Sequence, residues 1–310
     1  MPPERHVLQP VHRRTRRRRH RGRPKDPGRS RGERSTGVLR PRGLRQGSAR
    51  LSDPRLSPRN PRVRRARRLA TDRSARRLEG LFLVEGPVLA AEAVVSRVDI
   101  IEQFVLAQRD AIAGVEAHVV DERVLASVSD VETPRSPVLV CRIPSSVDLA
   151  SVEGWVIVAD AVSDPGNLGT ISRCAEIAGA AALVVTGGAT DPWSPKCVRA
   201  SAGASFHVPI VEVGSLADVR DGGFTVVATT SHARPGGVGS GAGRQVITME
   251  ECDFSGRVAV VLGNESRGVS ADAPVDRWVT IGHVGRGESL NVAMACAILS
   301  HHISRVRAGH

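Results

Sequence analysis

Apolar runs and helix-like segments alternate regularly after Gly154, and this alternation limits the possible folds. Four short runs have the length and composition of strands buried on both faces of a parallel sheet: 155–159, 182–185, 224–228 and 258–262. Segments of helical character separate or follow them: 168–179, 195–204, 216–220 and 289–305. We therefore predict an α/β fold for residues 152–308, with an open parallel sheet and helices on both faces. Ligands of such sheets bind beside the carboxyl ends of the strands.

A second, smaller region of mixed pattern precedes this one. Residues 56–145 have the size of a small α/β domain, and we predict one there. The expected strands are 80–86, 100–106 and 137–142, and a further short element begins near residue 119. The expected helices are 88–95 and an arginine-rich helix at 61–78.

Charge is distributed very unevenly along the chain. Residues 1–80 contain 27 Lys and Arg against 6 Asp and Glu, whereas the remaining 230 residues contain 17 against 26. A basic front end on an acidic body indicates a polyanionic partner, with nucleic acid as the first candidate. A merely solvated tail would have the same composition. Residues 1–55 are rich in Arg, Pro, Gly and Ser and are predicted to be disordered. They are either an RNA-binding tail or the result of a translation start assigned too far upstream.

The cysteines and the apolar runs indicate the cellular compartment in which the protein works. The five cysteines are widely spaced and form no C-x-x-C pair or zinc-binding pattern with His, so we predict no metal site and a reducing compartment. No apolar run approaches the roughly 20 residues that cross a bilayer, and no apolar segment follows the basic N-terminus as in a signal peptide. We therefore predict a cytoplasmic protein with no membrane partner.

The first of three polar loops, residues 160–173, follows a predicted strand and opens a predicted helix. We predict that Asn167 caps this helix and that Gly169 lets another backbone approach closely. We predict that Arg173 lies on the first or second turn, where it could reach a phosphate or a ribose. Taken alone, the same pattern is that of a plain helix start with an exposed arginine.

Two further loops have the residues of ligand sites. In residues 260–268, Gly263 and Gly268 flank a glutamate and an arginine, which predicts a tight turn with backbone amides facing a ligand. In residues 281–293, Ser289 and Asn291 are predicted to begin a helix whose small residues allow close packing. Each loop alone is equally explained by an ordinary turn with a solvated Glu–Arg pair, or by an ordinary capped amphipathic helix.

Taken in order, the three loops resemble the motifs of the SpoU–TrmH family (SPOUT superfamily) of RNA 2′-O-ribose methyltransferases. The matching patterns are P-x-N-x-G-x-x-x-R at 165–173, L-G-x-E-x-x-G at 262–268 and S-L-N-V at 289–292. The resemblance covers residues 152–308. It implies a C-terminal trefoil knot in the sheet domain and a homodimer with its active site near the subunit interface. It also implies methyl transfer from S-adenosyl-L-methionine to a ribose 2′-hydroxyl of RNA.

The resemblance implies roles for individual residues. The adenosine of the methyl donor is expected to contact backbone in or near the motifs, around Gly263, Ile281, Leu290 and Thr229. The expected catalytic residues are Arg173, Asn167, Glu265, Ser289 and Asn291. A guanidinium is a very poor base, so we expect Arg173 to clamp a phosphate and to stabilise the developing alkoxide. The other four are expected to orient Arg173 and the ribose.

The smaller domain extends the resemblance. The segment G-L-F-L-V-E-G-P at 80–87 and the pair Thr133-Pro134 resemble the small substrate-binding domain of ribosomal-RNA members. The tRNA enzymes of the family generally lack this domain, so the resemblance favours 23S rRNA as the substrate. A tRNA 2′-O-methyltransferase remains an alternative.

Two alternatives from other functional classes also remain. The family usually has Ile-Pro-Met where this chain has Ile281-Gly282-His283, which predicts a looser donor pocket and leaves a non-catalytic RNA-binding protein open. A nucleic-acid-compacting protein would need only the arginine-rich tail. Removal of residues 1–55 separates these functions, because compaction would vanish while methylation would largely survive.

Overall fold

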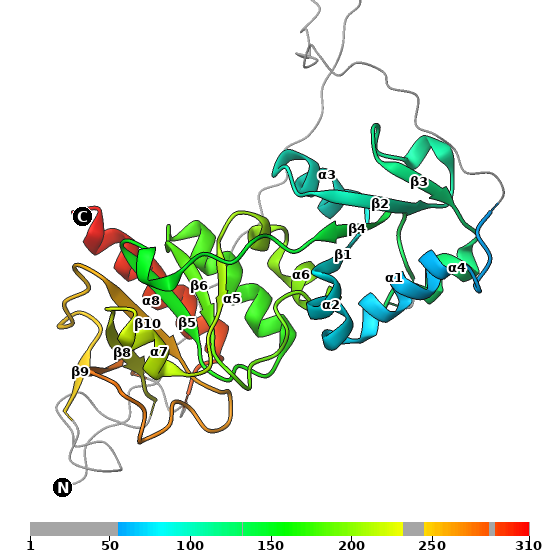
Figure 1. The fold of residues 1–310 in the computed structure, drawn as a ribbon. Coiled ribbons are helices and arrows are strands. Elements are labelled where there is room, and N and C mark those ends of the chain that lie inside the picture. Colours follow the sequence, from blue (N-terminus) through cyan, green and yellow to red (C-terminus); the bar gives the residue numbers. More distant parts are fainter. Residues whose placement is uncertain (1–54, 132, 232–244, 285–288, 310) are drawn as a thin grey trace, which may run out of the picture. The chain divides into compact units, whose positions relative to one another are not determined.

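The computed structural model describes residues 55–131, 133–231, 245–284 and 289–309. The predicted N-terminal tail (except Arg55) and residues 285–288 of the third loop lie outside these ranges. The described chain contains a seven-stranded sheet and a four-stranded sheet, each with its own helices (Figure 1). None of the described helices is long and apolar enough to cross a membrane.

The larger sheet is parallel throughout, with the strand order β7-β6-β5-β10-β8-β11-β9. Its strands are β5 (Trp155–Ala159), β6 (Ala182–Val185), β7 (Ile210–Glu212), β8 (Thr225–Thr229), β9 (Val246–Thr248), β10 (Val258–Leu262) and β11 (Arg277–Thr280). The four predicted runs correspond to β5, β6, β8 and β10, with β8 displaced by one residue. Because β10 pairs with β5, the loops that follow these two strands start side by side. The Asp160 amide donates to the Leu262 carbonyl oxygen at 2.8 Å.

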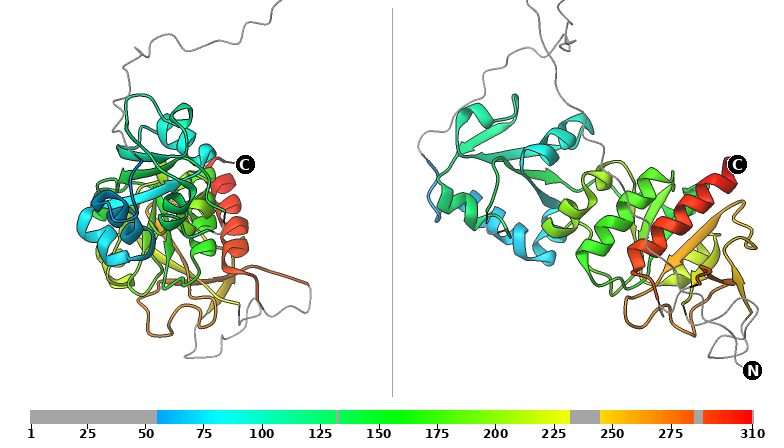
Figure 2. Two further views of the ribbon diagram at one scale, coloured as in Figure 1. Left: turned by 90° about the vertical axis from the view of Figure 1, so that its right-hand side faces the viewer. Right: turned by 180° about the vertical axis from the view of Figure 1, so that it is seen from behind.

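Helices cover both faces of this sheet, which confirms the predicted layer arrangement. The helices are α5 (Pro165–Ile177), α6 (Pro195–Ser201), α7 (Leu216–Asp221) and α8 (Val292–Arg307), with the 3-10 helices η2 (Leu149–Ser151) and η3 (Ala204–Phe206). On one face, Leu168 of α5 and Leu299 of α8 belong to the same buried core. On the other face, Leu216 and Val219 of α7 pack against the sheet. Figure 2 shows α8 lying beside α5, with which it makes extensive contact.

The smaller sheet has the order β1-β4-β2-β3, with β2 and β3 parallel and the other pairs antiparallel. Its strands are β1 (Leu81–Glu85), β2 (Ile100–Val105), β3 (Glu116–Val119) and β4 (Val138–Arg142). Its helices are α1 (Pro61–Thr71), α2 (Arg73–Glu79), α3 (Pro87–Val95), η1 (Gln108–Asp110) and α4 (Glu122–Ser127). The prediction of one helix over 61–78 was wrong. Asp72 has extended backbone and caps α2 by accepting from the amides of Ser74 and Ala75, so the helix is divided there.

Two arginines of α1 form ion pairs with a buried glutamate of the smaller sheet. The Glu102 side chain is fully buried and accepts from Arg62 at 2.7 Å and from Arg65, with His118 Nε2 at 3.1 Å. Burial raises the pKa of Glu102, but the hydrogen bonds from His118, Arg65 and Arg62 outweigh burial and lower the pKa to about 2. Among the described side chains, Glu102, Glu116 and His118 form the one group with a metal-binding composition. Two guanidiniums already bond Glu102, so this group fastens α1 to the sheet.

Removing the charge at this position should destabilise the protein measurably. We expect Glu102→Gln to lower the free energy of unfolding by about 2–3 kcal/mol at pH 7, because two guanidiniums lose their buried partner. The folded-state pKa of Glu102 lies below that of an exposed carboxyl, so the stabilisation is present at neutral pH and is lost as the pH falls toward 2. Urea unfolding at several pH values measures this. Glu153→Gln, at an exposed position, is the matched control, and equal losses in the two variants would contradict the expectation.

Candidate active site

A cavity of about 550 Å³ lies at the carboxyl ends of β8, β10 and β11. Its wall includes all four predicted donor-binding residues, Thr229, Gly263, Ile281 and Leu290. The volume is in the usual range for a small-molecule site, and the position is the one at which open parallel sheets bind ligands. Much of the wall is apolar: Leu262, Val269, Trp278, Val279, Ile281, Leu290, Val292 and Ala295. Such a wall can accept the flat face of a base.

Gly263 is the tightest position in the wall of this cavity. A Cβ added there would lie 2.4 Å from the Gly268 carbonyl carbon and 2.4 Å from the Val269 nitrogen, both of them backbone atoms. The loop closes on itself, with the Gly268 amide donating to the Asn264 carbonyl oxygen at 2.8 Å. The predicted tight turn is therefore present, and it has no room for a side chain at residue 263.

Glu265 joins the first and second loops. Its carboxylate accepts from the Ser163 amide at 3.1 Å, the Ser163 hydroxyl at 2.8 Å, the Asp164 amide at 3.1 Å and Asn167 Nδ2 at 3.0 Å. Partial burial raises the pKa of Glu265, but the hydrogen bonds from Asn167 and Ser163 outweigh it and lower the pKa to about 2. Glu265 is therefore a fixed anion with its lone pairs in use, and the alternative of a solvated Glu–Arg pair was wrong.

Asn291 joins the third loop to the other two. Its Nδ2 donates to Asn167 Oδ1 at 3.0 Å, and its Oδ1 caps α8 by accepting from the amides of Ala293 and Met294. A direct chain of hydrogen bonds thus runs from Glu265 through Asn167 to Asn291. Ser289 and Asn291 both lie in the cavity wall, and Ser289 precedes the helix cap.

The predicted helix cap at Asn167 was wrong. Asp164 is the N-cap of α5, with Pro165 at the first helical position, and its side chain accepts from the Asn167 amide at 2.9 Å. Asn167 therefore lies in the first turn with its side-chain amide free to bridge Glu265 and Asn291. The predicted close approach at Gly169 is present, because a Cβ there would lie 2.5 Å from the Cys197 carbonyl oxygen of α6.

Arg173 is the one predicted catalytic residue that stands apart from the other four. It is the ninth residue of α5 and lies on the third turn, not the first or second, because the helix begins at Pro165. Its side chain is exposed and is not in the wall of the cavity. No hydrogen bond or ion pair joins its guanidinium to any residue in the described ranges. Within the described part of the chain, the Arg173 side chain is therefore free to bind a ligand.

Two polar residues that hold the site together, Asn264 and Asp164, were not predicted from the sequence. Asn264 holds the second loop: its Nδ2 donates to the Ala161 carbonyl oxygen at 2.9 Å, and its Oδ1 accepts from the amides of Ser266 and Arg267 at 3.1 Å each. Asp164 could have been found, because an aspartate directly before a proline is a helix-start signal. The sequence around Asn264 contains no such signal, because its partner Ala161 follows the neighbouring strand β5 and is far away in the sequence.

The unusual Gly282-His283 pair lies beside Ile281, one of the predicted donor-binding residues. His283 and Ile281 both line the cavity, and a Cβ at Gly282 would meet no atom within 4 Å. His283 Nδ1 lies 3.4 Å from the Ile281 carbonyl oxygen. An imidazole therefore forms part of the cavity wall where the family usually has methionine.

The chain is similar to known proteins over most of its length. Residues 154–301 match the SpoU rRNA Methylase family, and residues 60–138 match the MRM3-like substrate binding domain. The 23S rRNA (guanosine(2553)-2′-O)-methyltransferase RlmP of Bacillus subtilis is 32% identical over 257 residues, which are 80% of this chain and 97% of that protein. The chain belongs to the SpoU rRNA methylase family.

Two solved structures of similar proteins extend the comparison to the fold. The AdoMet-bound rRNA methyltransferase from Sinorhizobium meliloti has a TM-score of 0.68 at 26% identity, covering 83% of this chain and 98% of that one. The SpoU methyltransferase AviRb from Streptomyces viridochromogenes, in complex with AdoMet, has a TM-score of 0.69 at 27% identity, covering 81% and 99%. The predicted family and α/β fold class are confirmed.

Proposed function

We propose that this SpoU family member transfers a methyl group from S-adenosyl-L-methionine to a ribose 2′-hydroxyl of 23S rRNA. The observation that carries the proposal is the hydrogen-bonded chain of Glu265, Asn167 and Asn291 beside a cavity of suitable size. The Bacillus subtilis relative, which this chain covers almost completely, is named for this reaction on 23S rRNA. The match of residues 60–138 to the MRM3-like substrate binding domain supports a separate region that binds the substrate.

The cavity fits the methyl donor. The Gly263 backbone forms part of the cavity wall and leaves no room for a side chain, and Ile281 and Leu290 offer backbone and apolar surface for the adenosine. The Thr229 hydroxyl donates a hydrogen bond to the Val261 carbonyl oxygen at 3.0 Å, so this residue shapes the wall of the cavity. When bound, the donor supplies an electrophilic methyl group on its sulfonium. The protein then has to align the ribose oxygen with that group and stabilise the oxygen as it loses its proton to solvent water.

In this proposal the five predicted catalytic residues have different tasks. Glu265 holds the first two loops in register and stays ionised, so it does not take the ribose proton. Asn291 and Ser289 orient the ribose from the cavity wall, and Asn167 connects them to Glu265. Arg173 grips an RNA phosphate and stabilises the developing alkoxide, since a guanidinium remains charged throughout.

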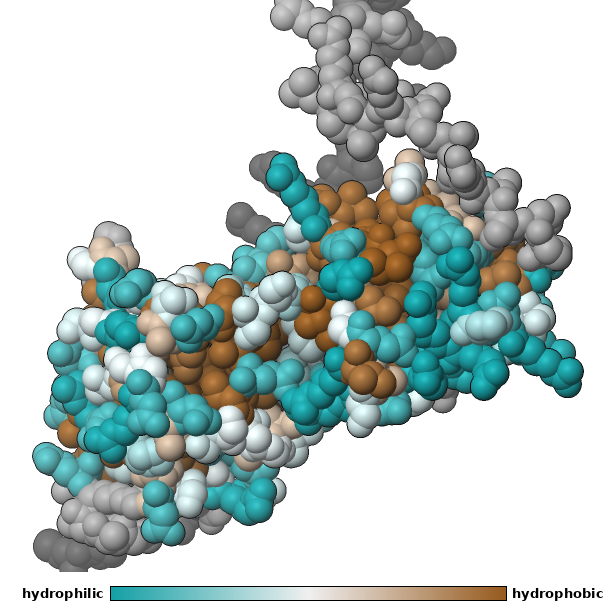
Figure 3. Space-filling view, viewed as in Figure 1, coloured by the Kyte–Doolittle hydropathy of each residue, from teal (hydrophilic) through white to brown (hydrophobic). Residues whose placement is uncertain are grey.

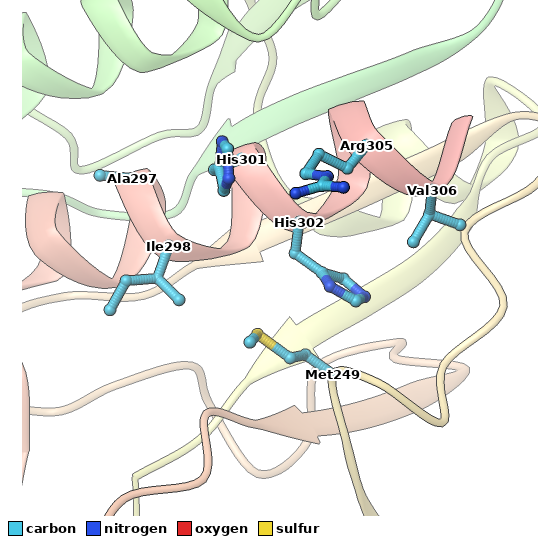
Figure 4. A pocket seen from close by; sticks show the side chains of 7 residues that line it. All are labelled: Met249, Ala297, Ile298, His301, His302, Arg305 and Val306. Atoms are coloured by element: carbon cyan, nitrogen blue, oxygen red, sulfur yellow. The ribbon is translucent and has the colours of Figure 1, made fainter. Parts of the chain in front are cut away.

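We also propose that the protein acts as a homodimer through α8 and α5. Apolar side chains are exposed on these helices: Met294 is 62% exposed, Val306 is 46% exposed and Ile177 is 77% exposed. An open groove of about 610 Å³ runs along α8, where Ile298, His302 and Val306 project on the side of Met249 (Figure 4). A second copy would cover this surface. In the proposed dimer, the Arg173 side chain of one copy reaches the cavity of the other copy. It does not line the cavity of its own chain.

Subunit complementation tests this arrangement. Arg173→Ala and Gly263→Ala should each be inactive, but dimers that contain one of each should have one complete site. Co-expressed variants should recover about a quarter of wild-type activity, since about half the dimers are mixed and each has one working site of two. A mixture as inactive as the separate variants would show that Arg173 acts within its own subunit.

We propose that residues 56–145 are the RNA substrate-binding domain and residues 152–308 the catalytic domain, supported by the two separate sheets and the two family matches. We propose that the C-terminal part of the larger sheet region forms the family's trefoil knot. The position of β10 between β5 and β8 and the packing of α8 against α5 support this proposal. A ribosomal RNA substrate supports a cytoplasmic location.

The reaction itself can be tested with purified protein. We expect methyl-labelled donor to label 23S rRNA and not tRNA, and the label to lie on a ribose. Guanosine 2553, named for the Bacillus subtilis relative, is the first position to examine. Labelling of tRNA alone would favour the tRNA alternative, and no labelling of either RNA would favour the non-catalytic one.

A further inference from the structure

One charged side chain in the cavity wall has no part in the site described above. Arg267 belongs to the second loop and lines the same cavity as Gly263 and Leu290. Its side chain is exposed, and its guanidinium makes no hydrogen bond or ion pair within the described part of the chain. It is also the one fixed positive charge among the described residues that line the cavity.

The backbone under Arg267 is held in place, although its side chain is free. Asn264 Oδ1 accepts from the Arg267 amide at 3.1 Å, and Asn264 is itself tied to the Ala161 carbonyl oxygen at 2.9 Å. The Gly268 amide closes the turn on the other side. Other arginines of this region bond backbone carbonyls, as Arg277 does to Asp253 and Arg307 to Phe254. The turn that carries Arg267 is therefore fixed. The Arg267 side chain faces the cavity without a hydrogen bond or an ion pair to the rest of the described chain.

We propose that Arg267 binds the carboxylate of the methyl donor's amino-acid end and selects donors that carry it. This inference rests on the proposed function, because it requires the cavity to hold S-adenosyl-L-methionine. A carboxylate that enters a partly apolar cavity loses hydration and needs a cation, and a guanidinium offers it two parallel hydrogen bonds. The other charged residue that lines the cavity, Glu265, has the wrong sign for this task.

An RNA phosphate is the other oxyanion that this reaction brings near the site. The position of Arg267 favours the donor, because the residue lies in the wall of the donor cavity, whereas the phosphate of the RNA is the partner already proposed for Arg173. The two sources predict different results. Loss of a carboxylate contact weakens donor binding, while loss of a phosphate contact weakens RNA binding and its salt dependence.

Calorimetry on the full-length protein can measure this contact directly. The probes are S-adenosylhomocysteine and its decarboxylated analogue, which keeps the adenosine, the sulfur and the amine. Wild-type protein should bind S-adenosylhomocysteine about tenfold to a hundredfold more tightly than the analogue. Arg267→Ala should lose this preference by weakening only the binding of S-adenosylhomocysteine, and Arg267→Lys should keep part of it. Arg109→Ala, which removes an exposed arginine of the smaller sheet region, should keep the wild-type preference.

The inference is overturned if Arg267→Ala keeps the wild-type preference, or if it weakens both ligands equally. It is also overturned if donor binding is unchanged while binding of a 23S rRNA fragment weakens and loses salt dependence, because Arg267 then contacts phosphate. Failure of the wild-type protein to bind S-adenosylhomocysteine at all would contradict the proposed function instead. Unchanged melting of Arg267→Ala without ligand, expected for an exposed side chain, shows that the comparison is between folded proteins.

Discussion

Arg173→Ala should reduce 2′-O-methylation by at least about a hundredfold to a thousandfold while leaving the fold and donor binding nearly intact. The side chain is exposed on the third turn of α5 and bonds no described residue, so its removal disturbs no packing. Its proposed contacts are with the RNA phosphate and the ribose oxygen and not with the donor, so donor affinity should not change. Its loss should therefore fall on the chemical step. Single-turnover assays with saturating donor and RNA, beside calorimetry with S-adenosylhomocysteine, measure the two effects separately.

Arg173→Lys is the informative companion variant. A compact ammonium cannot reproduce a two-pronged grip on phosphate and ribose, so we expect little recovery of the single-turnover rate. Near-normal rates in Arg173→Ala would mean that the residue is ordinary helix surface, as its sequence context alone also allowed. Near-normal rates in the lysine variant alone would mean that charge matters and the fork geometry does not.

Gly263→Ala should abolish donor binding or weaken it by at least about a hundredfold. The added Cβ would lie 2.4 Å from two backbone atoms of the same loop, at Gly268 and Val269. No side chain can rotate away to relieve this contact, so the loop itself must move. That movement displaces the wall of the cavity beside the adenosine. Calorimetry with S-adenosylhomocysteine measures the loss.

A second glycine beside the same cavity provides the control. Gly282→Ala places its Cβ in open space, with no atom within 4 Å, so donor affinity should remain near that of the wild type. Thermal melting without ligand checks that both variants fold. Equal affinities in the two variants would show that the Gly263 loop does not bound the donor site.

The large sheet could be predicted because its central strands are buried on both faces. Such strands are continuous apolar runs, and β5, β6 and β10 coincide with the runs that the sequence shows. The strands β7, β9 and β11 were not predicted, because these segments of three or four residues include polar residues and are not continuous apolar runs, as Arg277–Thr280 illustrates. The division at Asp72 depends on a side-chain cap that competes with a continuous helix.

The site could be predicted in part, and the limits have physical causes. Motif order indicated that the loops of Asn167, Glu265 and Asn291 meet, and the structure joins these residues by direct hydrogen bonds. The cap was misplaced because Asp164 and Asn167 are both good capping residues, and Pro165 decides between them. The free guanidinium of Arg267 could not be distinguished from a solvated ion pair until the partners of Glu265 were known.

The proposed activity of this SpoU family member is the methylation of a ribose in 23S rRNA. Mass-spectrometric mapping of ribose methylations in rRNA and tRNA from a deletion strain tests it most directly. We predict that one 2′-O-methyl group disappears from 23S rRNA, that the wild-type gene restores it and that the Arg173→Ala gene does not. A complete set of 23S rRNA ribose methylations in the deletion strain would contradict the claim, as would a loss confined to tRNA.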